Sequence, residues 1–148
     1  MPASFIPLPF VLVIVFWVIL LRYILPKFGG WSKLAEKYGT DRDPKTENVK
    51  NLRIWYCNIG GMKYKNVVRF YETNDGLLLT QMWLFKGNQP NLFIPWKAIN
   101  DVEDRTILFQ KRKRLNIGHP IVVSYIELWE KDFRKIADHL PEKNRYVP

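Results

Sequence analysis

The side chains with the clearest capacity for binding are basic, and one group of them lies in the stretch GGMKYKNVVRF. This stretch carries Lys63, Lys65 and Arg69. Side chains alternate between the two faces of a strand, so this spacing predicts all three on one face. A charge run of this kind is most often a solvated face, and a contact surface for an anionic partner is the alternative.

The densest basic run is KRKR, which comprises Lys111, Arg112, Lys113 and Arg114. On a strand these side chains alternate between both faces, so they do not form one flat patch. A protruding loop that contacts lipid or RNA is one interpretation, and a solvated turn is the other. The run lacks the interleaved aromatic residues of RNA-binding signatures, so nucleic acid is not favoured as a partner.

Residue types that support catalysis or metal binding occur without the patterns that these chemistries need. The acidic run DVED lacks the glycine and the spaced oxygen ligands of a calcium loop. The only two histidines, His119 and His139, have no cysteine partner at zinc spacing. Ser124 and Cys57 have no nucleophile motif around them, and no glycine-rich phosphate loop is present. The sequence therefore predicts a protein that is not an enzyme and uses no metal or cofactor.

The chain opens with an apolar run from Phe5 to Leu25, in which only Arg22 is charged. At ~1.5 Å per residue a helix of this length spans the ~30 Å hydrocarbon layer, with the arginine reaching toward the headgroups. We therefore expect a transmembrane anchor over residues 1–26. A cleaved secretory signal would need a basic start and a small-residue cleavage site. A buried core helix would show a polar stripe.

Charge predicts how such an anchor would be oriented. The basic residues that flank the run all follow it, so the positive-inside rule places the remainder of the chain in the cytoplasm. A single cysteine agrees with a reducing compartment. The chain has 23 basic and 14 acidic residues, and each basic group near an anionic leaflet contributes about 1 kcal/mol of attraction. The sequence thus predicts a single-pass protein of the cell (inner, cytoplasmic) membrane with a basic cytoplasmic domain.

Residues 27–50 form the expected junction. Trp31, Leu34, Ala35 and Tyr38 recur at helical spacing, and they predict a short amphipathic helix followed by a polar linker. Two positions for this helix remain open. It could lie at the membrane interface with Trp31 at headgroup level, or it could pack on the domain that follows.

Residues 51–141 are predicted to form one β-rich domain. Strand-like runs such as NLRIWYCNI, YKNVVRFYE, LLLTQMWLF, TILFQKRKRLNI and IVVSYIELW are separated by turn residues. Asp75-Gly76 between two of them predicts a hairpin. The segment KDFRKIADHLP then predicts a closing helix with Asp132 as its cap. The expected fold is mainly β (α+β), with six or seven antiparallel strands and a C-terminal helix, before a tail at residues 142–148.

The order of these elements resembles the pleckstrin-homology-like (PH-like) fold. The stretches GGWSKLAEKY (29–38) and NLFIPWKAI (91–99) are similar to those of small uncharacterised bacterial proteins that have an N-terminal transmembrane helix and a PH-like domain. Membrane-binding versions of this fold use lysine and arginine around the first hairpin to bind phosphorylated headgroups. The resemblance thus implies such a role for Lys63, Lys65 and Arg69, although their spacing departs from the usual lipid-binding pattern.

The second of these stretches also predicts a corner. Pro95 cannot donate a hydrogen bond on both sides, so its strand should lie at a sheet edge, and Trp96 should anchor the corner that follows. We expect one turn to bring Ile99 and Val102 onto the same core. The alternative is a ligand groove with Trp96 as its floor.

The function predicted from the sequence is a membrane-anchored binding or scaffolding module. Its partners would be the lipid bilayer, anionic lipid headgroups and other membrane protein subunits. An accessory structural subunit of a larger membrane complex is the alternative, because a high aromatic content suits such an interface.

Overall fold

The computed structural model describes residues 7–21, 30–86 and 89–140, and it consists mainly of short antiparallel strands. The helices are α1 (Leu8–Ile19), α2 (Gly30–Tyr38), α3 (Trp83–Lys86) and α4 (Glu130–Phe133), with 3-10 turns at Trp96–Ala98 and Ala137–His139. The strands are β1 (Gly39–Thr40), β2 (Lys50–Asn51), β3 (Tyr56–Ile59), β4 (Met62–Lys65), β5 (Val68–Glu72), β6 (Gly76–Gln81), β7 (Asn91–Pro95), β8 (Ile99–Ile107), β9 (Gln110–Ile117) and β10 (Ser124–Trp129).

The predicted transmembrane helix is not found. No helix within the described residues is both long enough and apolar enough to cross a membrane. Helix α1 has 12 residues, which corresponds to a rise of about 18 Å, well short of the ~30 Å hydrocarbon core. The prediction of an anchor over residues 1–26, and of a single-pass location in the cell membrane, is therefore wrong. Arg22 and the tail at residues 142–148 lie outside the described residues.

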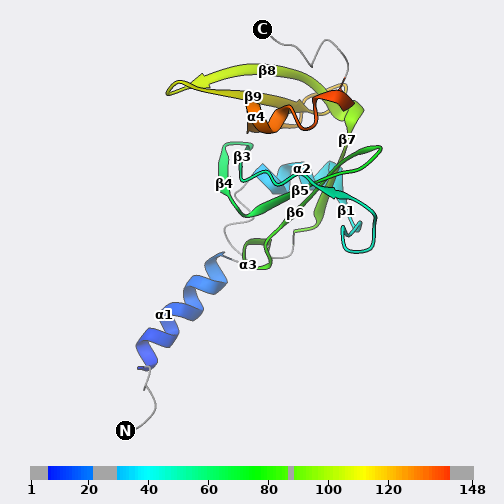
Figure 1. Cartoon of the computed structure of the whole chain (residues 1–148). Coiled ribbons are helices and arrows are strands. Elements are labelled where there is room, and N and C mark those ends of the chain that lie inside the picture. The colour runs from blue at the N-terminus through cyan, green and yellow to red at the C-terminus, as the bar shows by residue number, and fades with distance from the viewer. Residues whose placement is uncertain (1–6, 22–29, 87–88, 141–148) are drawn as a thin grey trace.

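Helix α1 is nevertheless apolar on all sides. None of its residues is buried, and Figure 1 shows it projecting away from the β-rich body. It therefore contributes no side chain to the core.

Two five-stranded antiparallel sheets form the body. The first sheet has the order β1-β7-β6-β5-β2, and the second has the order β4-β3-β10-β9-β8. Buried side chains from both sheets belong to one hydrophobic cluster, which includes Leu79 of the first sheet and Leu115 of the second. The core thus lies between the sheets, as expected for two sheets that each have an apolar face.

Helix α2 belongs to this core. Its residues Trp31 and Leu34 are buried in the cluster, and the indole N–H of Trp31 donates to the carbonyl of Pro90 at 2.9 Å. Of the two positions that the sequence left open for this helix, packing on the domain is therefore confirmed. Trp31 is not available for contact with a lipid or a partner.

A close approach of two glycines joins α2 to the β3–β4 turn. A Cβ added to Gly30 would lie 2.1 Å from the carbonyl oxygen of Ile59 and 2.7 Å from the Cα of Gly60. Both contacts are with backbone atoms, so a side chain could be accommodated only if the helix moved away from the turn.

We expect Gly30→Ala to lower the free energy of unfolding by about 1–3 kcal/mol, because overpacking at a backbone contact has this range. Urea denaturation followed by tryptophan fluorescence measures the change. Glu36→Ala, on the exposed side of the same helix, is the matched control and should change stability by less than about 0.5 kcal/mol. Equal stability of the two variants would contradict the close approach.

The predicted fold class is wrong in its strand count as well as in its anchor. Within the described residues, ten strands in two sheets replace the six or seven that were expected, because residues with positive φ interrupt several runs. Arg53 (φ 55°) separates β2 from β3 inside NLRIWYCNI, and Asn66 (φ 58°) separates β4 from β5. The hairpin at Asp75-Gly76 is confirmed, since Glu72 pairs with Leu77 in the β5–β6 ladder.

The closing helix is also shorter than predicted. Helix α4 ends at Phe133, and Asp132 is not its cap but a buried carboxylate paired with Lys135 at 3.0 Å. The apolar face of the segment is as expected, because Phe133, Ile136 and Leu140 are all buried in the core. The chain reaches these positions through one helical turn and a 3-10 turn instead of a continuous helix.

The corner after β7 is confirmed as a 3-10 turn at Trp96–Ala98. Pro95 lies in the second strand of its sheet and not in an edge strand, but β1 pairs only with Asn91 and Leu92, so Pro95 has no neighbour on that side. Ile99 and Val102 are both buried in the core, as predicted. The cause is a β-bulge between Ile99 and Asp101, since residues three apart on a regular strand face opposite sides.

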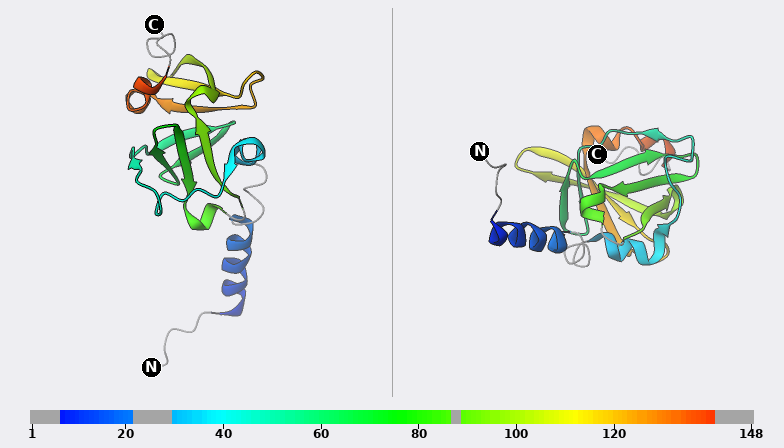
Figure 2. Two further views of the ribbon diagram at one scale, coloured as in Figure 1. Left: turned by 90° about the vertical axis from the view of Figure 1, so that its right-hand side faces the viewer. Right: turned by 90° about the horizontal axis from the view of Figure 1, so that it is seen from below.

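The longest hairpin among the described residues is β8–β9. Figure 1 and the right-hand view of Figure 2 show that its turn extends beyond the rest of the body. Strand β8 is the edge strand of the second sheet, and its register with β9 runs to the pair Ile107–Gln110. Only Leu108 and Phe109 remain for the turn.

Candidate functional site

The three basic residues of the first stretch do not share one strand. Lys63 and Lys65 are exposed on β4 of the second sheet, whereas Arg69 lies on β5 of the first. Its guanidinium donates to Asn66 at 3.1 Å. The prediction of one common face is therefore wrong, because the chain turns at Asn66 and passes to the other sheet.

The run KRKR lies on β9, and its side chains alternate as predicted. Arg112 and Arg114 lie on the outer face of the second sheet, where both contact Glu127. Lys113 is buried on the opposite face, where it pairs with Asp104 and lies over the ring of Phe133. Three of the four basic side chains of the run are therefore held in ion pairs within the protein.

Glu127 of β10 is the acidic centre of the outer face. It is 1% exposed, and its two carboxylate oxygens accept from Arg112 at 3.4 Å and from Arg114 at 3.1 and 3.3 Å. Arg112 also donates to the hydroxyl of Tyr56 at 3.0 Å. A buried carboxylate requires such partners, so the two arginines are held by a structural ion cluster.

Aromatic rings line one end of the same face. The ring of Trp129 stacks on Tyr56 with a centroid distance of 5.4 Å and on Trp55 at 6.1 Å. Lys131 lies 4.9 Å above Trp129, and Trp55 is 48% exposed. Because Lys65 pairs with Tyr56 and Trp129 pairs with Arg112, these residues form a row across four strands at one end of the sheet.

The turn of the β8–β9 hairpin extends beyond this row. Leu108 is 87% exposed, Phe109 is fully exposed, and the preceding Ile107 is also exposed. We call the tip formed by Ile107, Leu108 and Phe109 the finger. An apolar tip as exposed as Leu108 and Phe109 is unusual for a turn, where polar residues and glycine predominate.

The backbone of the finger is strained. Leu108 and Phe109 have φ values of 50° and 68°, as a two-residue turn of type I′ requires, and such turns prefer asparagine and glycine. A bulky residue in this region costs about 1–3 kcal/mol. Two large apolar residues therefore occupy positions where stability alone would favour others.

Exposed basic side chains surround the finger. Arg105 and Lys111 flank it on β8 and β9, and neither forms an ion pair within the part of the chain that the structure describes. Lys65 and Lys131 lie at the same end of the sheet. The finger, the exposed Trp55 and these four cations together are here named the finger end.

From the sequence alone, the finger is expected inside a single strand. Its run TILFQKRKRLNI is in fact a hairpin, with the turn at Leu108–Phe109. No glycine, asparagine or proline marks this turn. The available signal was three successive apolar residues directly before a basic run, which does not fit the alternation expected of one half-buried strand.

Trp96 is part of the corner. Its indole N–H donates to the carbonyl of Asn74 at 3.2 Å, and its ring stacks on His139 with a centroid distance of 4.3 Å. His139 in turn contacts Glu72. These contacts attach the C-terminal turn to the first sheet.

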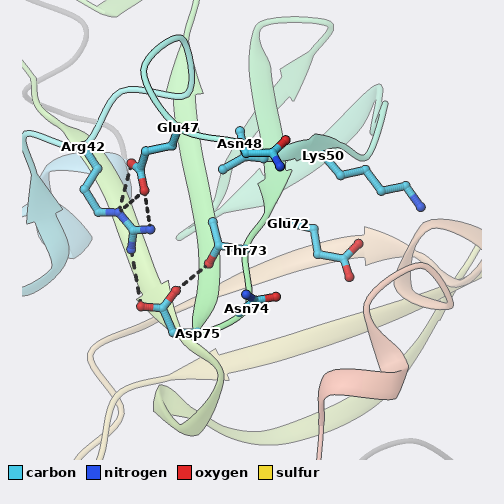
Figure 3. Close-up of a pocket in the computed structure, with 9 residues that line it drawn as sticks. Arg42, Glu47, Asn48, Lys50, Glu72, Thr73, Asn74 and Asp75 are labelled. Carbon is cyan, nitrogen blue, oxygen red and sulfur yellow. Dashed lines mark hydrogen bonds and ion pairs between the residues drawn. The ribbon is translucent and has the colours of Figure 1, made fainter.

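A hollow in the described surface lies beside the loop that precedes β2 (Figure 3). Its volume is about 560 Å³, and its lining includes Arg42, Glu47, Thr73 and Asp75. Arg42 contacts Glu47 at 2.7 Å and Asp75 at 3.6 Å. The hydrogen bond from Arg42 lowers the pKa of Glu47, and the hydroxyl of Thr73 lowers that of Asp75. The charges of Arg42, Glu47 and Asp75 are thus paired with one another.

Of the residues predicted for a site, the finger end brings together Lys65 and Lys111 with Arg112 at its base. Lys63 lies farther along β4, Arg69 lies in the other sheet, and Arg114 and Lys113 are held in internal pairs. No protein-family model matches the chain, and no curated protein matches it either.

Proposed function

We propose that the protein is a non-enzymatic binding module that docks on an anionic lipid surface through the finger end. The observation that carries this proposal is the finger itself, an apolar tip whose Leu108 and Phe109 are almost entirely exposed in a strained turn. Docking of this kind occurs at a surface and requires no spanning helix.

The chemistry of the finger end matches the interface of a bilayer. Burial of a large apolar side chain such as that of Leu108 or Phe109 contributes about 1.5–3 kcal/mol when it is complete. Each basic group near an anionic surface adds about 1 kcal/mol. Arg105 and Lys111 stand beside the apolar tip, so headgroup contact and tip insertion can occur together.

Charge favours lipid over an apolar groove of another protein. The cations around the finger have no acidic partners among the described residues, and an anionic surface supplies many such partners at once. The exposed Trp55 suits the headgroup region, where tryptophan is enriched.

The test uses a fluorophore at the tip. Leu108→Cys in the full chain can be labelled selectively, since the only native cysteine, Cys57, is buried and burial raises the pKa of its thiol. We expect the emission of an environment-sensitive label to shift to the blue with vesicles that contain phosphatidylserine. The shift should weaken as salt is raised.

The matched control carries the same label at Ile121, which is 77% exposed in the loop at the other end of β9. Its emission should stay unchanged when the vesicles are added. Equal shifts at both positions, or no shift at position 108, would contradict docking through the finger. A shift at position 108 that appears only with a protein partner would favour the accessory-subunit alternative instead.

A further inference from the structure

A second feature of the described surface has the chemistry of a ligand site, and it lies at the edge of the second sheet. A pocket of about 200 Å³ is lined by residues of β4, the end of β6 and the helix α3, together with Val67 and Leu21. Met62, Tyr64, Val67 and Phe85 supply most of its lining, together with Lys63 and Lys65. None of the residues that line it is acidic.

The size of the pocket sets the size of its ligand. An apolar cavity of about 150 Å³ holds one benzene molecule, so a pocket of about 200 Å³ accommodates a short alkyl segment. It is smaller than the ~300–1,000 Å³ that is usual for drug-sized ligands.

Charge sets the nature of the ligand's polar end. Lys63 and Lys65 are both exposed on the edge strand, and neither forms an ion pair within the described residues. Two free ammonium groups beside an apolar pocket favour an anion that is attached to an alkyl chain.

We infer that this pocket binds a single-chain anionic amphiphile, a fatty-acid carboxylate, with the alkyl chain against Met62, Val67 and Phe85 and the carboxylate beside Lys63 and Lys65. The inference goes beyond docking on a lipid surface, because the pocket is separate from the finger. It also gives a role to Lys63, which lies away from the finger end.

Titration calorimetry of the full chain with decanoate, without vesicles, tests this. We expect saturable binding with one site. Decyltrimethylammonium has the same chain and the opposite charge. Its affinity should be at least about tenfold lower than that of decanoate. Acetate, which has the charge without the chain, should also bind at least about tenfold more weakly. The methyl resonance of Met62 should shift on addition of decanoate.

Two variants locate the site. Lys63→Glu/Lys65→Glu should weaken decanoate binding about tenfold or more, while Lys33→Glu/Lys97→Glu, the same charge change at exposed lysines elsewhere, should leave it unchanged. Val67→Trp should abolish binding by filling the pocket. The lysine variant decides the matter if the tryptophan variant does not fold.

Absence of decanoate binding, or binding that neither the lysine change nor the pocket-filling change affects, would overturn the inference. Equal binding of the cationic amphiphile would overturn the role of the lysines. Because these measurements contain no vesicles and leave Leu108 and Phe109 unchanged, their failure would leave the proposed docking function standing. Failure of the vesicle experiment would likewise leave this pocket standing.

Discussion

Replacement of Leu108-Phe109 by Asn-Gly is expected to stabilise the protein and at the same time to weaken its binding to anionic vesicles. Both native residues have positive φ values in a two-residue turn, and Asn-Gly is the pair that such a turn prefers. Relief of the strain should raise the free energy of unfolding by about 1–2 kcal/mol. A gain in stability with a loss of binding is the signature of residues retained for function.

The loss of binding follows from the apolar surface removed. Two large side chains that are partly inserted contribute about 3 kcal/mol together, which corresponds to roughly 100-fold in affinity. Vesicle titration of a chain that begins at residue 22 measures this without a contribution from α1. Such a chain keeps the core, because α1 contains no buried residue.

Ile121→Asn is the matched control, since it removes an exposed apolar side chain from the opposite end of the hairpin strand. It should leave vesicle affinity unchanged. Unchanged affinity of the Asn-Gly variant would refute the proposed docking surface, whereas lower stability of that variant would show that the turn is not strained.

Loss of the buried carboxylate at position 127 should have the largest effect on stability. Glu127→Gln leaves the guanidinium groups of Arg112 and Arg114 without a counter-charge in a site where the carboxylate is 1% exposed. Removal of one partner from a buried ion cluster costs about 3–5 kcal/mol. This is a large part of the ~5–15 kcal/mol that stabilises a typical domain, so urea denaturation should show a much lower midpoint.

Two further variants distinguish charge from packing. Glu103→Gln, an exposed position that pairs with Arg114 in the β8–β9 ladder, should change stability by less than about 0.5 kcal/mol. Substitution of all three cluster members by apolar residues, as in Glu127→Leu/Arg112→Met/Arg114→Met, should recover most of the loss, because no buried charge then remains. A loss below about 1 kcal/mol for Glu127→Gln would contradict the cluster.

Local patterns in the sequence were sufficient for several elements. The helical spacing of Trp31 and Leu34 predicted α2, and Asp75-Gly76 predicted the hairpin between β5 and β6. The apolar positions Phe133, Ile136 and Leu140 were placed in the core although the helix that was to carry them is broken. Each of these features depends on residues that are near one another in the chain, which is the range at which propensity and periodicity act.

The turn at Leu108–Phe109 could not be predicted in the same way. Its residues are apolar and bulky, so turn chemistry gave no sign of it, and the run that contains it was assigned to one strand. Only the pairing of Ile107 with Gln110 in the β8–β9 ladder defines the turn. The same holds for Ile99 and Val102, whose common burial depends on a bulge that a pattern of spacing cannot distinguish from a helical turn.

By itself the sequence determined the basic charge of the protein, its β-rich composition and the alternation of the KRKR side chains. Tertiary structure alone decided which charges are available. It pairs Arg112 and Arg114 with Glu127 and Lys113 with Asp104, and it leaves Lys111 beside the finger. The physical reason is that neutralisation of a charge depends on which strands lie side by side, and strand pairing joins residues that are distant in the chain.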